Sequence, residues 1–221
     1  RIFLLLAIAM LALLSVACAN DTTSNTTKQA PQIAAKTTYT NSLAGKKILV
    51  AYFSATNNTK RVAEEIAQAT GADIYRIEAA QSYSANPYDD KDLIQKEAYE
   101  NLRPEVKAPL PASEMAKYDV IFVGSPIWWH QPAMVVCTFL ESYDLSGKTV
   151  VPFFTYGARS YLNESMQRIY KSTPNSVHVP ASLPKDIEPD DIQQSQNDDD
   201  GIIMPADVGN IDAWLKVLQL K

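Results

Sequence analysis

The sequence predicts an α/β fold in which a parallel sheet is covered by helices on both faces. Two observations carry this prediction: from residue 47 onward, short apolar runs alternate with segments of helical periodicity, and 46% of the 221 residues are hydrophobic. Parallel strands need long crossover connections, which the helical segments supply. The length suffices for one sizeable hydrophobic core.

The composition argues against several classes of function. Asp and Glu number 25 against 20 Lys and Arg, which gives a net charge of −5 and a poor match to nucleic-acid phosphates. The 2 cysteines, Cys18 and Cys137, exclude a disulfide scaffold, and with only 2 histidines no metal site is expected. Cys137 falls at an inward position of a predicted helix, so we expect it to pack in the core.

Residues 1–17 have the pattern of a secretory signal. One basic residue precedes an unbroken apolar run that is shorter than the roughly 20 residues of a membrane span. Two cleavage sites remain open. Ala17 and Ala19 form an A-x-A site around Cys18, whereas the residues leading to Cys18 resemble a bacterial lipobox, in which this cysteine would carry a lipid.

Residues 18–45 predict a flexible tether. They are rich in Thr, Ser, Asn, Ala and Gln, with too little apolar surface to offset the entropy of ordering. Such a tether favours the lipobox, because it would hold residues 46–221 clear of a membrane. We therefore expect an exported protein of the bacterial cell envelope, anchored to a membrane through a lipid on Cys18, with one folded domain over residues 46–221.

The predicted elements follow one another in order along this domain. Residues 47–53 form a continuous apolar run, typical of a strand covered on both faces. The next helix begins near Thr59, has apolar residues at helical spacing and ends at Gly71. The later elements are strands at residues 73–77, 118–124, 149–154 and 176–181, and helices that start at Pro132, span residues 163–171 and follow Asn210.

Two long connections interrupt the alternation. Residues 81–113 contain a helix-like stretch at 90–101 and form either a lid over a ligand or a surface excursion. Residues 184–207 are acidic, and their spacing lacks the pattern of a calcium loop. We predict a solvated loop there.

Ligands of a doubly wound sheet bind outside the carboxyl ends of its strands, so three loops matter: 54–59, 125–131 and 155–161. The first of these places hydroxyls and amides at a helix N-terminus, where unpaired N–H groups attract an anion such as a phosphate monoester. Alternatively, its Ser and Thr side chains only cap the helix. The loop contains neither glycine nor lysine, which argues against a Walker loop or a Rossmann fingerprint.

The second loop carries two adjacent tryptophans, Trp128 and Trp129, where a strand emerges to solvent. They either pack onto a neighbouring helix or form a flat apolar wall for an aromatic ring. A phosphate site beside an aromatic wall indicates a ligand in which a flat ring is joined to a phosphate.

These loops carry motifs of a known family. The segments Tyr-Phe-Ser-Ala-Thr-Asn-Asn-Thr-Lys at 52–60, Gly-Ser-Pro-Ile-Trp-Trp at 124–129 and Thr-Phe-Leu-Glu-Ser-Tyr-Asp-Leu-Ser-Gly-Lys at 138–148 closely resemble the flavodoxin family. The nearest match is to bacterial flavodoxin-like proteins with a Pro-Ile-Trp-Trp loop. The resemblance covers about residues 46–171 and the last helix, and it implies non-covalent FMN binding on a doubly wound, five-stranded parallel sheet in the order 2-1-3-4-5.

The resemblance also implies roles for individual residues. The FMN phosphate would be held by Ser54, Thr56, Asn57, Asn58 and Thr59. Pro126, Ile127, Trp128 and Trp129 would line one side of the isoalloxazine, and Thr155, Tyr156 and Gly157 would border the other, with Arg159 near its N1 and O2 edge.

Three places depart from the family pattern. Asn57 replaces a usual Gly, and Asn tolerates the left-handed backbone conformation better than other residues. Arg159 and Tyr161 replace a Gly-rich stretch, and they either cover the flavin or crowd it out. His130 also stands where Gly is common. It is either a partly exposed loop residue or a proton donor, and it is our candidate catalytic residue.

The predicted function is that of an FMN-binding redox protein. It would pass electrons or hydride equivalents to a small acceptor such as a quinone, with a small molecule or a protein as redox partner. Residues 125–131 contain no glycine to ease the backbone flip of one-electron flavodoxins, which favours two-electron reduction. The alternative is a flavin-free envelope binding module that uses the same cleft for another aromatic or phosphorylated ligand. A hydrolase is disfavoured, because the chain has no Gly-x-Ser-x-Gly motif.

Overall fold

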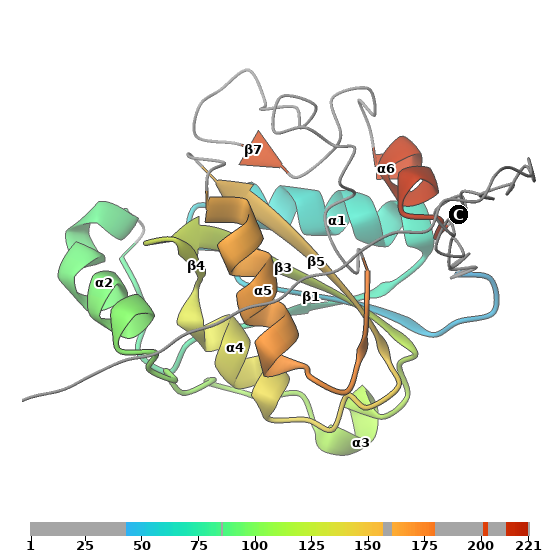
Figure 1. The fold of residues 1–221 in the computed structure, drawn as a ribbon, viewed down its shortest axis with the longest axis horizontal. Coiled ribbons are helices and arrows are strands. Elements are labelled where there is room, and N and C mark those ends of the chain that lie inside the picture. Colours follow the sequence, from blue (N-terminus) through green and yellow to red (C-terminus); the bar gives the residue numbers. More distant parts are fainter. Residues whose placement is uncertain (1–42, 85, 157–160, 180–200, 203–210, 221) are drawn as a thin grey trace, which may run out of the picture. The chain divides into compact units, whose positions relative to one another are not determined.

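Five parallel strands form the sheet at the centre of the fold (Figure 1). The computed structural model describes residues 43–84, 86–156, 161–179, 201–202 and 211–220, all of which fall in one unit of the chain, residues 39–221. The order of the strands is β2-β1-β3-β5-β6, which confirms the predicted order 2-1-3-4-5. Their bounds are β1 Ile48–Tyr52, β2 Asp73–Arg76, β3 Val120–Trp128, β5 Thr149–Tyr156 and β6 Val177–His178.

Helices cover both faces of this sheet, as the alternation predicted. Helices α1 (Asn58–Thr70) and α6 (Ile211–Val217) contribute to one buried cluster, and α4 (Met134–Glu141) and α5 (Leu162–Ser172) contribute to the other. Figure 1 shows the two pairs on opposite sides of the strands. Cys137 is fully buried in α4, which confirms its predicted place in the core.

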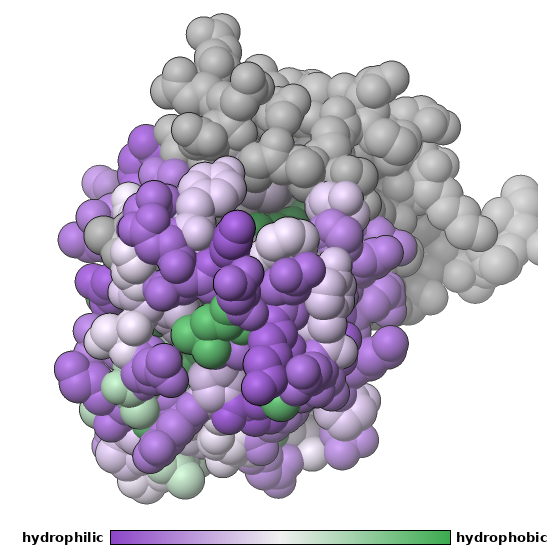
Figure 2. Space-filling model, turned by 90° about the vertical axis from the view of Figure 1, so that its left-hand side faces the viewer, coloured by the Kyte–Doolittle hydropathy of each residue, from purple (hydrophilic) through white to green (hydrophobic). Residues whose placement is uncertain are grey.

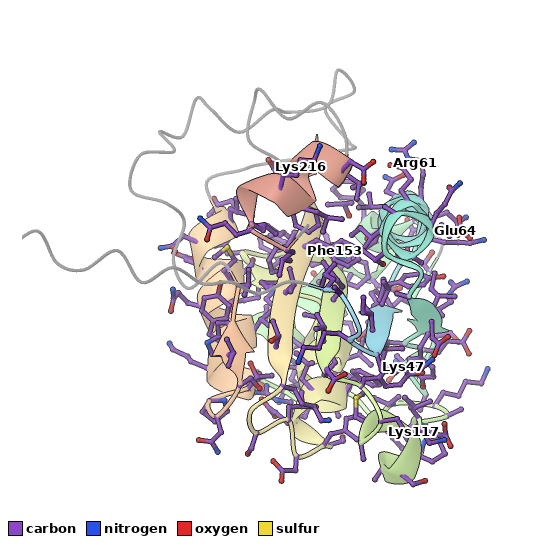
Figure 3. All side chains as sticks on the ribbon, turned by 90° about the vertical axis from the view of Figure 1, so that its right-hand side faces the viewer. Lys47, Arg61, Glu64, Lys117, Phe153 and Lys216 are labelled. Atoms are coloured by element: carbon purple, nitrogen blue, oxygen red, sulfur yellow. The ribbon has the colours of Figure 1, made fainter. Side chains whose placement is uncertain are left out.

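The core on the α1 and α6 side is built around aromatic side chains of the central strands. Phe122 of β3 lies 6.2 Å from Trp214 of α6 between ring centroids. Phe153 of β5 is fully buried and points inward beneath α6, whereas the labelled charged side chains lie on the outside (Figure 3). At Gly124 a Cβ atom would overlap the Phe153 ring, so glycine at this position of β3 leaves room for the ring of the neighbouring strand β5.

The edge that carries the loops differs from the prediction in two places. Strand β3 continues past Gly124 through the predicted loop as far as Trp128, because it pairs with a short antiparallel strand, β4 (Gln131–Pro132). Pro132 therefore belongs to β4, and helix α4 starts two positions later, at Met134. The predicted loop 125–131 is thus largely a β-hairpin.

Other differences concern the end of the chain. Strand β6 has only 2 residues, and residues 180–181 of the predicted strand lie outside the described residues. Within the predicted solvated loop 184–207, β7 (Gly201–Ile202) pairs antiparallel with the last two residues of β5. Asn210, the expected cap of α6, is also outside the described residues.

The connection between β2 and β3 is attached to the domain at several points. It contains a 3₁₀ helix, η1 (Pro87–Asp90), and the helices α2 (Lys91–Tyr99) and α3 (Ala112–Met115). Ala79 forms a β-bridge with Val106, and the Tyr143 hydroxyl of the α4–β5 loop donates a hydrogen bond of 2.7 Å to the Leu110 carbonyl. These contacts argue against a simple surface excursion.

Candidate functional site: a cavity at the carboxyl edge of the sheet

The predicted loops meet around one cavity of about 870 Å³. Its lining comes from the loop after β1, the β3–β4 hairpin and the end of β5, all at the carboxyl edge of the parallel strands, where ligands of this sheet type bind. The η1–α2 segment supplies the remaining wall. The lining residues are Ala55, Thr56, Asn58, Thr59, Asn86, Pro87, Tyr88, Lys91, Ile94, Pro126, Ile127, Trp128, Trp129, His130, Thr155, Tyr156 and Tyr161.

The loop after β1 presents an uncapped helix N-terminus to this cavity. Asn57 is the N-cap of α1 and adopts a left-handed backbone with φ 69°, as expected for Asn in place of Gly. Its side chain makes no capping hydrogen bond, and the first turn contains no acidic residue. The first-turn N–H groups and the positive end of the helix dipole therefore favour an anion here.

Buried hydroxyls surround the same loop. Ser54 is 2% exposed, and its Oγ atom has no hydrogen-bond partner among the described residues. Thr59 uses its hydroxyl for a buried bond of 2.8 Å to the Thr155 hydroxyl, which joins the β1 loop to the end of β5. Neither side chain caps α1, so the described contacts argue against the alternative in which they only cap the helix. An unpartnered buried hydroxyl is costly unless a ligand or solvent satisfies it.

The β3–β4 hairpin turns on Trp129 and His130. Their φ values are 46° and 69°, in the left-handed region that two-residue hairpins need and that Asn and Gly usually occupy. The Ser125 hydroxyl accepts a hydrogen bond of 2.9 Å from the Ala133 N–H and so closes the base of the hairpin. Two bulky residues in this conformation store strain, and strain of this kind concentrates at functional sites.

The far side of the hairpin is braced from α5 and from the end of α2. Arg168 of α5 donates to the Gln131 side-chain oxygen at 2.8 Å and to the Asn101 side-chain oxygen at 2.7 Å. Next to it, Arg103 forms two hydrogen bonds to the Glu141 carboxylate, at 2.6 and 2.8 Å. The Arg103 guanidinium holds the pKa of Glu141 below its ordinary value. These bonds connect the wall of the cavity to the helices behind it.

The two tryptophans take different places. Trp128 packs edge-on against Phe53 and Tyr83, with ring centroids 5.3 Å apart in each pair, and so belongs in part to the core. Trp129 is 38% exposed and lies 6.3 Å from the Tyr99 ring of α2. Both line the cavity. Trp128 thus packs on residues that follow β1 and β2 and not on a helix, whereas Trp129 lies near the last residue of α2.

His130 is paired with an aromatic ring at the rim of the cavity. Its imidazole stacks on Tyr161, with ring centroids 3.5 Å apart and the planes inclined by 13°. Both rings line the cavity. Tyr161 therefore lies against the hairpin turn, where one face of its ring contacts the His130 imidazole.

The η1–α2 wall belongs to residues 81–113, for which the sequence left a lid over a ligand and a surface excursion open, and no residue of it was among the predicted site residues. Tyr83 connects this wall to the β3–β4 hairpin, because its ring packs against Trp128 and its hydroxyl donates a hydrogen bond of 2.8 Å to the buried Glu97 carboxylate of α2. Burial raises the pKa of Glu97, and the nearby Asp90 adds to this effect, although the Tyr83 hydrogen bond opposes it. Burial and the Glu97 carboxylate raise the pKa of Tyr83.

Replacing Glu97 by Gln is expected to stabilise the protein at pH of about 8 and to leave its stability unchanged near pH of about 4. The raised pKa means that the folded state resists ionisation, so stability falls as the pH rises from the unfolded-state pKa to the folded-state pKa. Gln keeps an oxygen that accepts from Tyr83 but cannot ionise. Denaturant unfolding across this pH range measures the difference. The control is Glu100→Gln at the exposed end of α2, and a Glu97→Gln variant that loses stability at high pH contradicts the prediction.

Comparison with known proteins agrees with this geometry. A family model described as Flavodoxin matches residues 47–195, more than half of the chain. The chain belongs to the flavodoxin family. No curated protein matches it. Family membership supports FMN as the cofactor of this flavodoxin-family chain, in agreement with what the resemblance implied.

Solved structures with the same fold include three similar proteins. A candidate flavoprotein from Bacteroides eggerthii DSM 20697 is 39% identical, with a TM-score of 0.55, over 60% of this chain and 84% of that one. A candidate flavoprotein from Bacteroides uniformis ATCC 8492 is 35% identical, with a TM-score of 0.52, over 61% of this chain and 89% of that one. A flavoprotein in complex with FMN from Lactobacillus acidophilus NCFM is 24% identical, with a TM-score of 0.51, over 60% and 89% of the two chains, and shares the fold.

Most of the predicted flavodoxin site residues lie together. Those that line the cavity are Thr56, Asn58, Thr59, Pro126, Ile127, Trp128, Trp129, His130, Thr155 and Tyr156. Ser54 and Asn57 do not line it: Ser54 is buried beneath the loop, and Asn57 shapes the backbone of the turn. Gly157, Arg159 and Cys18 lie outside the described residues.

Within the described ranges, no group of three or more His, Cys, Asp and Glu side chains is placed to hold a metal ion. No helix in that part of the chain is long and apolar enough to cross a membrane.

Proposed function

We propose that this flavodoxin-family chain uses FMN to pass electrons or hydride equivalents to a small acceptor such as a quinone. The observation that carries the proposal is the cavity in which an uncapped helix N-terminus faces the same space as two indole rings. The helix end suits a phosphate and the indoles suit a flat ring, and FMN contains both groups.

The residues around the cavity fit FMN. The first turn of α1 has no side-chain cap, and a phosphate oxygen would satisfy its N–H groups. Thr56 and Asn58 line the cavity beside these groups and would add side-chain hydrogen bonds. Trp129 and Ile127 would lie against the isoalloxazine, while the Thr155–Thr59 bond keeps the phosphate loop and the end of β5 together.

Bound FMN would supply the redox chemistry, by accepting electrons from a nicotinamide or protein donor and yielding them to the acceptor. The protein would exclude water with its aromatic walls and hold the ring at the hairpin. His130 would place an imidazole N–H at the rim, held in orientation by the stack on Tyr161, where it can move a proton to the acceptor.

Titration of the purified chain with FMN tests the proposal, with flavin fluorescence as the readout and riboflavin as the comparison. We expect saturable quenching, tighter binding of FMN than of riboflavin, and reduction of a quinone when NAD(P)H or a reduced protein donor is added. Absence of flavin binding would contradict the proposal and favour the flavin-free binding module.

We also propose that the protein works at the cell envelope, held there by a lipid on Cys18. Support comes from the apolar run of residues 1–17 and the tether-like composition of residues 18–45. Of these, residues 1–42 lie outside the described part of the chain. Mass spectrometry of the N-terminal peptide from the native host, together with membrane fractionation, tests this proposal. A soluble protein whose Cys18 carries no lipid would contradict it.

A further inference from the structure

The η1–α2 wall contains features that the binding of FMN alone leaves unexplained. Tyr88 is 81% exposed and lines the cavity. A large aromatic side chain that is exposed to water beside a cavity offers apolar surface that a second ligand would bury. Seen from the α2 side, the surface is mostly hydrophilic, with small hydrophobic areas between polar side chains (Figure 2).

Hydrogen bonds hold Tyr88 in this place. Asn86 accepts from the Tyr88 N–H at 3.2 Å and donates its side-chain N–H to Asp89 at 3.1 Å. The Ser84 hydroxyl donates to Asp89 at 3.2 Å, and the Ser84 N–H donates to Asp90. These bonds engage both carboxylates within the turn, and neither residue lines the cavity. These bonds hold the Tyr88 backbone at the cavity wall.

Lys91 adds a positive charge to the same wall. It is exposed and lines the cavity, and its side-chain ammonium group makes no hydrogen bond or ion pair with the described residues. The described lining contains no Asp or Glu, and Lys91 is the one Lys or Arg in it. A cation without a partner beside an apolar wall favours a flat ligand that carries a negative charge.

We propose that Tyr88 and Lys91 form a second subsite of the cavity, which binds a planar aromatic carboxylate beside FMN. This inference rests on the proposed function and names the class of acceptor as a quinone whose ring carries a carboxylate, for which a simple aromatic carboxylate is a redox-inert probe. The aromatic face of the acceptor lies against the Tyr88 ring, and its carboxylate pairs with the Lys91 ammonium group.

The test is a titration of the FMN-loaded full chain with naphthalene-2-carboxylate and with its neutral analogue naphthalene-2-carboxamide. The absorption spectrum of the bound flavin reports the approach of the second ring, and calorimetry gives the affinity. We expect the carboxylate to bind about fivefold more tightly than the amide. In Lys91→Gln this preference disappears, whereas Tyr88→Ala weakens both ligands by about fivefold. The control Lys96→Gln, an exposed residue of α2 outside the cavity lining, keeps the preference.

The affinity for FMN itself separates this inference from the proposed function. FMN is expected to bind Lys91→Gln and Tyr88→Ala as tightly as the unchanged chain. Weaker FMN binding by Lys91→Gln would assign the lysine to the cofactor phosphate and overturn the subsite. Normal FMN binding with no response to naphthalene-2-carboxylate would overturn the subsite alone, and a chain that binds no FMN would overturn both.

Discussion

Replacing Thr56 by Glu is expected to lower the affinity for FMN by about 100-fold and to leave the affinity for riboflavin nearly unchanged. Thr56 is an exposed residue that lines the cavity next to the uncapped N-terminus of α1. A carboxylate there repels the phosphate dianion and competes for the same N–H groups. Riboflavin has no phosphate, so it escapes this repulsion. Paired titrations with the two flavins measure the effect.

The same substitution should not harm the fold. A negative charge near a helix N-terminus is favourable, so the thermal midpoint of the Thr56→Glu variant is expected to match or exceed that of the unchanged chain. Thr56→Gln is the matched control, because it has nearly the shape of Glu without its charge, and it should retain most of the FMN affinity. Equal losses for FMN and riboflavin in the Thr56→Glu variant would place the phosphate elsewhere.

The elements that position this site were largely predictable, because their signals are local. The buried run at β1 and the helical spacing of α1 lie next to each other in sequence, and their junction must form a loop at the carboxyl edge. The left-handed Asn57 follows from the same local chemistry. In contrast, the strand order depends on which strands pair across long crossovers, and the family resemblance was needed to predict it.

The features of the fold and the site that the sequence did not predict depend on tertiary contacts. Trp129 and His130 are not residues that normally signal a two-residue hairpin turn, so the β3–β4 pairing had no turn signal in the sequence. Tyr88 and Lys91 line the cavity from a segment whose link to the rest of the site includes the Tyr83–Glu97 hydrogen bond, and no periodic pattern in the sequence predicts that contact. Strand β7 is likewise a pairing with β5 inside an acidic segment. Polar composition there predicted a loop, and backbone pairing does not depend on composition alone.

Trp128→Ala and Trp129→Ala are expected to affect stability and flavin binding to different extents. Trp128 packs against Phe53 and Tyr83, so Trp128→Ala opens a cavity and lowers the free energy of unfolding by about 3 kcal/mol. Trp129 is partly exposed and contributes less to the core, so its replacement costs about 0.5 kcal/mol of stability or less. Denaturant unfolding of the flavin-free proteins measures these values.

The two tryptophan variants are also compared by their affinity for flavins. Trp129→Ala removes a wall of the cavity and is expected to weaken both FMN and riboflavin by about 1 to 2 kcal/mol, since the lost contact is with the ring that the two flavins share. Trp129→Phe keeps an aromatic face and should recover part of this loss. If Trp129→Ala binds both flavins normally while Trp128→Ala fails to bind them at temperatures where it remains folded, then Trp128 alone carries the ring contact, and the ring lies deeper, toward Phe53 and Tyr83.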